Sequence, residues 1–302
     1  MTGLTKAPPA PGRSRLSLRL RPIACLTRLF LILAAATSLQ SCTSLSTLYY
    51  WSDTYISSQI DSYFDLNDEQ EAFVEWRLDH LLLQYKQQEI PKYIRFLEEI
   101  KARSRDRLTP EDLEWFRHTL NQFNQNIAYL LAEDTTLFLM TVSDKQLKTL
   151  EHELAEANRE VLEESRERDA ASEEKQLQRI YDNIEEWIGP LTEEQKQQIV
   201  AMGKPGKTSQ NIWYQRRLAS QRAFLKIMDS DLDQQQLKKA LLDWYPPEEE
   251  DYSAEYREYR NRRNARSDTL VLILSRTATD EQIRHFHRKL DNYIEELKEI
   301  LT

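Results

Sequence analysis

Trp187-Ile188-Gly189-Pro190-Leu191-Thr192-Glu193-Glu194-Gln195 is the stretch that decides the fold. Gly189 is typical of the residue after a helix, because glycine adopts positive φ without strain, and Pro190 prevents the helix from continuing. Thr192 and Gln195 then have the spacing of a capping box, in which each side chain binds the backbone N–H of the other residue. The stretch therefore predicts one helix that ends near residue 188 and another that begins at residue 193.

The same spacing predicts helix starts elsewhere in the chain. The pairs are Asn67 with Gln70, Ser143 with Gln146, Thr279 with Gln282 and, as a variant, Thr109 with Asp112. The simplest interpretation is structural, because an N-cap side chain satisfies backbone N–H groups that a helix start leaves unpaired.

Glycine is rare in the chain, which contains 5 among 302 residues, and only Gly189, Gly203 and Gly206 follow residue 41. Strand-rich folds need residues of positive φ at many turns. Between the predicted helix ends, apolar residues recur at helical spacing. We therefore expect residues 52–302 to form an all-α multi-helix bundle or array, either as one domain or as two subdomains that meet near residues 189–192.

Residues 143–188 contain neither proline nor glycine and predict a long central helix. Residues 163–176 within it include no apolar residue larger than alanine, so the sequence leaves open whether the helix is continuous and favours a projecting or frayed stretch there. Pro91 is expected to end or kink another helix near Ile90, because its ring clashes with the preceding turn.

Residues 1–41 have the pattern of a cleaved secretory signal peptide, with six basic residues, no acidic residue and an uncharged run that starts at Leu29. Leu39-Gln40-Ser41-Cys42 resembles a bacterial lipobox, in which the cysteine is lipidated and becomes the mature N-terminus, although Gln40 is uncommon at its position. An uncleaved membrane anchor is the alternative, but residues 23–39 include Arg28 and are shorter than the about 20 apolar residues of a spanning helix. We therefore expect a lipid on Cys42 and a tether over residues 42–51.

The mature chain is acidic. Removal of residues 1–41 leaves 35 basic and 50 acidic residues, a net charge of −15 (35 − 50). This charge argues against a nucleic-acid partner and against flat adsorption on an anionic membrane. A nucleotide is not expected either, because the glycines of Gly203-Lys204-Pro205-Gly206-Lys207-Thr208 have the wrong spacing for a phosphate loop and Pro205 removes an N–H donor. The expected attachment to the membrane is through the covalent lipid alone.

The sequence offers little for catalysis, and we expect no cofactor and no metal site. His285 and His287 are two residues apart and point to different faces of a helix, while His152 and Glu156 are an ordinary pair on a charged helix. Paired carboxylates remain open among 50 acidic residues. A cell-wall glycan-active enzyme, such as a peptidoglycan hydrolase, is therefore the alternative to a non-catalytic protein.

One basic stretch is interleaved with aromatic residues and is the candidate partner-binding segment. It contains Tyr256, Tyr259, Arg260, Arg262, Arg263 and Arg266. The plain interpretation is a solvated helix whose arginines pair with acidic residues elsewhere. The functional interpretation is a surface for lipid phosphates, glycan carboxylates or an acidic protein.

Leu191-Thr192-x-x-Gln195 resembles the motif of small, all-helical periplasmic stress proteins that act as ATP-independent chaperones. Over most of its length the chain resembles a family of helical lipoproteins of Gram-negative bacteria that carry a domain of unknown function. This second resemblance lies in the start from Cys42 to Trp51, in Tyr63-Phe64-Asp65-Leu66 with Gln70, in Ile90-Pro91-x-Tyr93 and in residues 186–192 with Gln195. It implies a fold and a location, and no activity.

Together these observations predict a non-catalytic, lipid-anchored periplasmic lipoprotein with a binding, chaperone or assembly role toward envelope proteins or peptidoglycan. Thr43, rather than aspartate, follows the lipidated cysteine. By resemblance to lipoprotein sorting rules, this favours the inner leaflet of the outer membrane.

Overall fold

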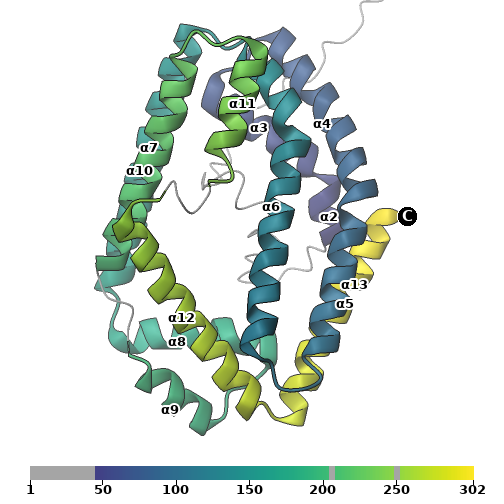
Figure 1. The fold of residues 1–302 in the computed structure, drawn as a ribbon, viewed down its shortest axis with the longest axis vertical. Coiled ribbons are helices and arrows are strands. Elements are labelled where there is room, and N and C mark those ends of the chain that lie inside the picture. Colours follow the sequence, from purple (N-terminus) through teal and green to yellow (C-terminus); the bar gives the residue numbers. More distant parts are fainter. Residues whose placement is uncertain (1–44, 204–207, 248–251) are drawn as a thin grey trace, which may run out of the picture.

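The computed structural model describes residues 45–203, 208–247 and 252–302. Within these ranges every regular element is an α-helix (Figure 1), which confirms the expected all-α class. The helices are α2 Leu45–Tyr50, α3 Ser52–Phe64, α4 Asp68–Gln88, α5 Ile90–Arg103, α6 Pro110–Leu139, α7 Asp144–Ala170, α8 Glu173–Ile188, α9 Glu193–Ala201, α10 Thr208–Met228, α11 Gln234–Trp244, α12 Ala254–Thr277 and α13 Asp280–Leu301.

Capping boxes begin the helices as predicted. Both reciprocal hydrogen bonds are present at Asn67, Thr109, Thr192 and Thr279. The Ser143 N–H donates to Gln146 Oε1 at 3.0 Å, and the Gln146 N–H donates to Ser143 Oγ at 3.4 Å. A further box, Asp233 with Gln236, begins α11 and was missed in the sequence although it has the same spacing.

Pro91 stands at the predicted kink. It is the second residue of α5, and Glu89 alone separates α5 from α4, so the two helices join into one of 36 residues. The proline has no N–H for the preceding turn, and the N–H groups of Lys92 and Tyr93 bond instead to the Glu89 carbonyl at 2.8 and 3.1 Å. The chain therefore contains a long helix, but it covers residues 68–103 and not residues 143–188, where the sequence predicted one.

Residues 143–188, whose continuity the sequence left open, divide into α7 and α8. The division lies at Ala171 and Ser172, within the polar stretch 163–176, and Ser172 caps α8 by accepting a bond from the Lys175 N–H. Figure 1 shows that α8 runs across the lower end of the molecule instead of continuing along α7. The polar stretch is thus the corner between two packed helices.

The N-terminal segment corrects one expectation. Residues 42–51 were expected to be a tether, but Leu45–Tyr50 form α2. Leu45 is buried in a core cluster with Ile94, Ile294 and Leu297. Burial of this side chain holds the start of the described chain against α13, which composition alone did not indicate.

Two apolar clusters form the core. The first joins α2, α5, α6 and α13 around Ile90, Phe96, Phe123 and Leu297. The second joins α4, α6 and α11 around Leu78, and its buried members are Val74, Leu78, Phe138, Leu139, Leu237 and Leu241. In Figure 1, α7 and α10 run along one side of the molecule, and α6 with the α4–α5 helix runs along the other.

The helices form two corresponding series. The first is α3, α4–α5, α6 and α7, and the second is α8, α9–α10, α11–α12 and α13. Residues 68–103 and 193–228 have the same length, and capping boxes start at Asn67, Thr109 and Ser143 in the first series and at Thr192, Asp233 and Thr279 in the second. The packing corresponds too, because α3 contacts α7 as α8 contacts α13, and α5 contacts α13 as α10 contacts α7. We interpret the chain as two corresponding halves, an internal repeat, whose helices interlock.

Candidate functional site

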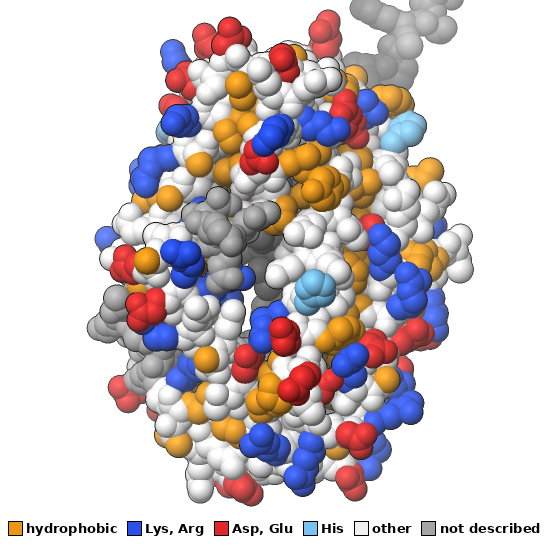
Figure 2. Space-filling view, in the orientation of Figure 1, with side chains coloured by type: hydrophobic (Ala, Val, Ile, Leu, Met, Phe, Trp, Pro, Cys, Tyr) orange, Lys and Arg blue, Asp and Glu red, His pale blue; other side chains and the backbone are white. Residues whose placement is uncertain are grey.

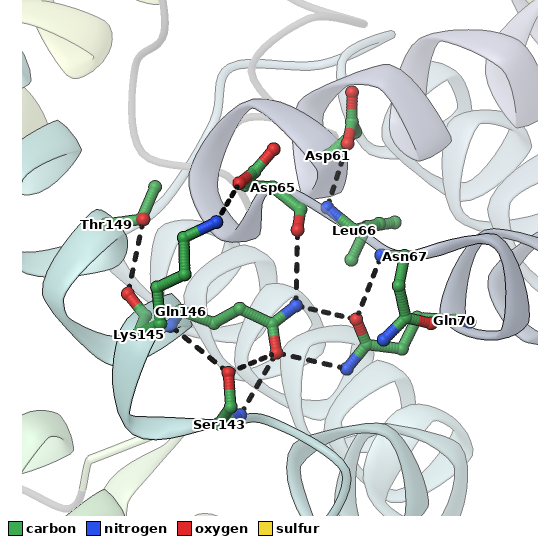
Figure 3. Close-up of polar contacts among 9 residues, drawn as sticks. All are labelled: Asp61, Asp65, Leu66, Asn67, Gln70, Ser143, Lys145, Gln146 and Thr149. Carbon is green, nitrogen blue, oxygen red and sulfur yellow. Dashed lines mark hydrogen bonds and ion pairs between the residues drawn. The ribbon is translucent and has the colours of Figure 1, made fainter.

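Gln70 and Gln146 each occupy the N3 position of a capping box, three residues after the N-cap. Their side chains lie against each other in the interior (Figure 3). Gln70 Nε2 donates to Gln146 Oε1 at 3.3 Å, and Gln146 Nε2 donates to Gln70 Oε1 at 2.6 Å. Each amide also binds the chain ahead of the other helix, since Gln70 Nε2 donates to the Thr141 carbonyl at 3.1 Å and Gln146 Nε2 to the Asp65 carbonyl at 3.3 Å. The residues that begin α4 and α7 therefore also hold these two helix starts together.

Gln195 and Gln282 form a second junction of the same kind. Gln195 Nε2 donates to Gln282 Oε1 at 3.0 Å, and Gln282 Nε2 donates to Gln195 Oε1 at 2.9 Å. The outer acceptors are the carbonyls of Thr277 at 3.2 Å and Pro190 at 2.8 Å. In both junctions the outer acceptor stands five residues before the partner glutamine, so the two glutamine junctions occupy equivalent places in the repeat.

The predicted motif glutamines are thus structural. Gln195 is 0% exposed and Gln282 3%, and their amides bind protein atoms on both sides. A buried amide that lacks partners costs about 1–3 kcal/mol, so a glutamine pair with four reciprocal and outer bonds favours one arrangement of the helix starts. At Gln70, Gln146, Gln195 and Gln282 the motif joins two helix starts, and its polar groups are used internally.

The candidate partner-binding segment lies on α12, which packs against α10. The ring centroids of Tyr252 and Tyr256 are 4.9 Å apart, and those of Tyr256 and Tyr259 are 5.9 Å apart. The guanidinium carbons of Arg216, on α10, and Arg260, on α12, each lie 5.1 Å from the Tyr252 ring centroid, within reach of a cation–π interaction. We call this group the Arg–Tyr surface, and it comprises Arg216, Tyr252, Tyr256, Tyr259, Arg260 and Arg263.

The charges around Tyr256 define the electrostatics of this surface. Burial raises the pKa of the Tyr256 phenol above its ordinary value, and Tyr252 acts in the same direction. The positive charges of Arg263, Arg216 and Arg260 oppose the rise. Three guanidinium groups therefore act electrostatically on the Tyr256 phenol, and together they offer hydrogen-bond donors and positive charge to an anionic group.

Not every predicted residue belongs to the Arg–Tyr surface. Arg262 forms an ion pair with Glu258 on its own helix. Arg266 donates to the carbonyls of Met202 and Gly203 and so caps the end of α9. Tyr252 and Arg216 were not predicted from the sequence. Tyr252 lies four residues before Tyr256, so helical spacing could have indicated it, whereas no sequence pattern pointed to Arg216.

Opposite charges are mixed over the molecular face drawn in Figure 2, where Lys and Arg side chains alternate with Asp and Glu. Among the described residues, no carboxylate forms an ion pair with Arg216, Arg260 or Arg263, whereas Arg262 has such a partner. Within the described residues, ion pairs therefore do not neutralise the positive charge of the Arg–Tyr surface.

An open cavity of about 210 Å³ lies where α6, α7, α10 and α11 meet. Its lining combines polar atoms with apolar side chains such as Leu139, Met140 and Met228, and Asp144 is its one carboxylate. Asp134 is not among the residues that line this cavity. Burial raises the pKa of its carboxyl group, and its Oδ1 atom forms an ion pair with Arg77 Nε at 3.0 Å. The cavity thus lacks the two facing carboxylates that glycoside hydrolysis requires.

Histidine and carboxylate side chains do not converge in the part of the chain that the structure describes, where no group of three could hold a metal ion. His152 and Glu156 approach to 4.0 Å on the surface of α7. His287 Nε2 lies 3.0 Å from Ser104 Oγ, and His285 Nε2 lies 3.4 Å from the Glu186 carbonyl. The two C-terminal histidines therefore contact different helices, in agreement with their spacing.

The predicted lipidation residue, Cys42, lies outside the described residues, so its modification stays a prediction from the sequence. Within the described ranges, no helix has both the length and the apolar character that crossing a membrane requires.

The comparisons with known proteins find one family. The model of a family described as "Family of unknown function (DUF6279)" matches residues 62–257. No curated protein and no solved structure matches the chain. The matched range includes both members of the first glutamine junction, Gln195 of the second and the start of α12.

Proposed function

The chain belongs to the DUF6279 family of unknown function, and we propose that it is a non-catalytic, lipid-anchored protein of the cell envelope that binds envelope proteins in a chaperone or assembly role. The proposal places the lipid on Cys42 and the domain on the periplasmic side of the outer membrane. The lipobox and signal-peptide pattern supports this location, and the resemblance of the motif to periplasmic chaperones supports the role.

The single observation that carries the binding role is the Arg–Tyr surface. Arg216 and Arg260 flank the Tyr252 ring at 5.1 Å, while the described residues supply no ion-pair partner for either cation. Arginine and tyrosine are the residues that most often dominate binding energy at protein interfaces, because each combines a large contact area with hydrogen-bond donors. We propose an unfolded or partly folded envelope protein with exposed carboxylates as the partner.

A charge reversal tests this role. The variant Arg260→Glu/Arg263→Glu is expected to lose most of the wild-type ability to slow aggregation of an unfolded outer-membrane protein, because two of the three cations of the Arg–Tyr surface become anions. The matched control is Arg95→Glu/Arg284→Glu, which makes the same change of charge at exposed positions on α5 and α13. Light scattering of the diluted client measures aggregation, and circular dichroism shows whether helicity is kept.

Two results would count against the proposal. Equal loss in both variants would mean that total charge, and not the Arg–Tyr surface, governs client binding. A wild type that neither slows aggregation nor retains any envelope protein would remove the chaperone role. Release of soluble fragments from purified peptidoglycan, abolished by one carboxylate substitution, would favour the glycan-active enzyme instead.

Lipidation is tested separately by mass spectrometry of the mature protein. The expected N-terminal residue is Cys42 carrying a diacylglyceryl group and an amide-linked fatty acid such as palmitate. The Cys42→Ser variant should remain unprocessed or become soluble. A mature wild type that still contains residues 1–41 would contradict the proposed anchor.

A further inference from the structure

The first described helix, α2, is fixed to the body of the protein. Leu45 is 5% exposed, and its backbone N–H donates to Glu296 Oε2 of α13 at 2.6 Å. Tyr49 Oη donates to the Leu82 carbonyl of α4 at 2.7 Å. One side of α2 is thus held by α13 and α4, which prevents the helix from swinging as a flexible linker would.

The other side of α2 and the start of α3 present aromatic rings to solvent. Tyr50 is 75% exposed, Trp51 59% and Tyr55 38%. The rings of Tyr50 and Trp51 meet edge to face with centroids 5.5 Å apart. We call these three residues the N-terminal aromatic surface. A group of exposed large aromatic side chains is unusual on a surface that faces only water. It indicates that this surface contacts a partner or a membrane.

The covalent chain brings this surface close to the predicted lipid. Cys42 precedes Leu45 by three residues, so their Cα atoms are at most about 11 Å apart whatever the conformation. The six residues of α2 then rise only about 9 Å. Because α2 is fixed to the body, a lipid on Cys42 would hold Tyr50 and Trp51 within reach of the membrane surface.

We propose that the N-terminal aromatic surface lies in the headgroup region of the bilayer that holds the lipid of Cys42. The inference rests on the lipidation in the proposed function. Tyrosine and tryptophan favour this region, because their rings are apolar while their O–H and N–H groups bond to water and headgroups. The acidic charge of the mature chain excludes attraction to anionic lipid as the cause, so the contact is apolar and insensitive to salt.

The contact gives the lipid anchor a second point of attachment. An acyl anchor alone leaves the attached domain free to rotate about its tether, whereas inserted rings next to the anchor fix one face toward the membrane. The protein would then present a constant orientation to its partners.

Depth-dependent fluorescence quenching tests the proposal on the purified mature protein. The protein is reconstituted into phosphatidylcholine vesicles whose lipids carry bromine on acyl carbons near the headgroups. Brominated lipid is expected to quench the wild-type tryptophan emission. Trp51→Phe should lose most of this quenching, whereas Trp213→Phe, which removes another of the six tryptophans, should keep it.

A second pair of variants keeps Trp51 as the reporter. Tyr50→Ser/Tyr55→Ser should reduce the quenching at least twofold, because two of the three inserted rings are gone, and Tyr129→Ser, at a 69% exposed tyrosine of α6, should not. Unchanged quenching in Trp51→Phe would overturn the membrane contact. Loss of self-association in Trp51→Ser, without quenching in the wild type, would overturn it in favour of a second copy of the chain.

The outcomes separate this inference from the proposed anchor. Protein that floats with the vesicles but shows no quenching of Trp51 keeps the anchor and contradicts the aromatic contact. Protein that lacks a lipid by mass spectrometry and does not float contradicts the anchor and the inference together.

Discussion

The two halves of the repeat share their junctions and differ in their middle helices. In the first half, α6 continues from Pro110 to Leu139. In the second half, the corresponding segment is divided into α11, which ends at Trp244, and α12, which begins at Ala254. Tyr252 lies in that division and packs against the cations of α10 and α12.

This difference separates structure from candidate function. The glutamine pairs, which both halves share, are buried and internally satisfied. The division of the middle helix, which only the second half shows, supplies Tyr252 to the partly exposed Arg–Tyr surface. We infer that the repeat provides a scaffold and that a departure from it provides the binding surface.

The largest expected effect is on the shared junctions. Gln195→Leu should lower the free energy of unfolding by about 2–4 kcal/mol, because it leaves the buried Gln282 amide without its partner. Gln70→Leu should cost the same within about 1 kcal/mol if the two junctions are equivalent. Equilibrium unfolding in urea measures both values.

The control for the junctions is Gln236→Leu. Gln236 has the same position in a capping box but is exposed and pairs with no second glutamine in the described residues. Its loss should therefore cost about 1 kcal/mol or less. Equal losses for Gln195→Leu and Gln236→Leu would show that capping, and not the glutamine pair, stabilises these joints.

An intermediate effect is expected where α12 supports α9. Arg266→Ala should lower the free energy of unfolding by about 1 kcal/mol, because Arg266 bonds to two carbonyls at the end of α9. Arg263→Ala, at an exposed position three residues earlier, should change it by less than about 0.5 kcal/mol. If Arg263→Ala lowers the free energy of unfolding in urea more than Arg266→Ala does, Arg266 does not have the structural role assigned to it.

The smallest effect concerns pH and distinguishes two corresponding contacts between the halves, α5 with α13 and α10 with α7. Burial lowers the pKa of His287 on α13, Lys101 and Arg105 lower it further, and Asp291 opposes them. The folded protein therefore takes up this proton less readily than the unfolded chain, so stability is full above the ordinary pKa of 6.5 and falls as the pH drops below it. In the corresponding contact, Arg217 on α10 donates to Asn158 on α7 at 2.7 Å, and neither side chain titrates in this range.

The measurement compares urea unfolding at pH 7.5 and pH 5.5. Wild type should lose more stability on acidification than His287→Gln does, because the variant has no proton to take up at this position. If both proteins show the same pH dependence, the contact between α5 and α13 is not where the protein responds to acid.

Local features of this fold could be predicted from the sequence. The capping boxes at Asn67, Thr109 and Thr192 depend on residues three positions apart, and Gly189 and Pro190 mark a helix end by their own backbone restrictions. Leu232-Asp233-x-x-Gln236 has the same spacing and could have been predicted in the same way, but it was missed.

Tertiary pairing could not be predicted in the same way. Gln70 meets Gln146 across 76 residues, and only the packing of α3, α4 and α7 selects that partner. Likewise, Arg266 was predicted as a binding residue, but α9 lies beside it and uses its donors. Leu45 was placed in a tether because its neighbours are small and polar, and its burial depends on α13.

Photo-crosslinking in cells tests the central claim most directly, because it asks whether α12 contacts a partner where the corresponding α6 does not. A benzophenone amino acid would replace Tyr259 on α12 in one strain and the exposed Tyr129 on α6 in another. We predict a crosslink from position 259 to an envelope protein, lost in the Arg260→Glu/Arg263→Glu background, and no comparable product from position 129. Equal crosslinking at both positions, or a product at 129 alone, would contradict the assignment of the binding surface to the departure from the repeat.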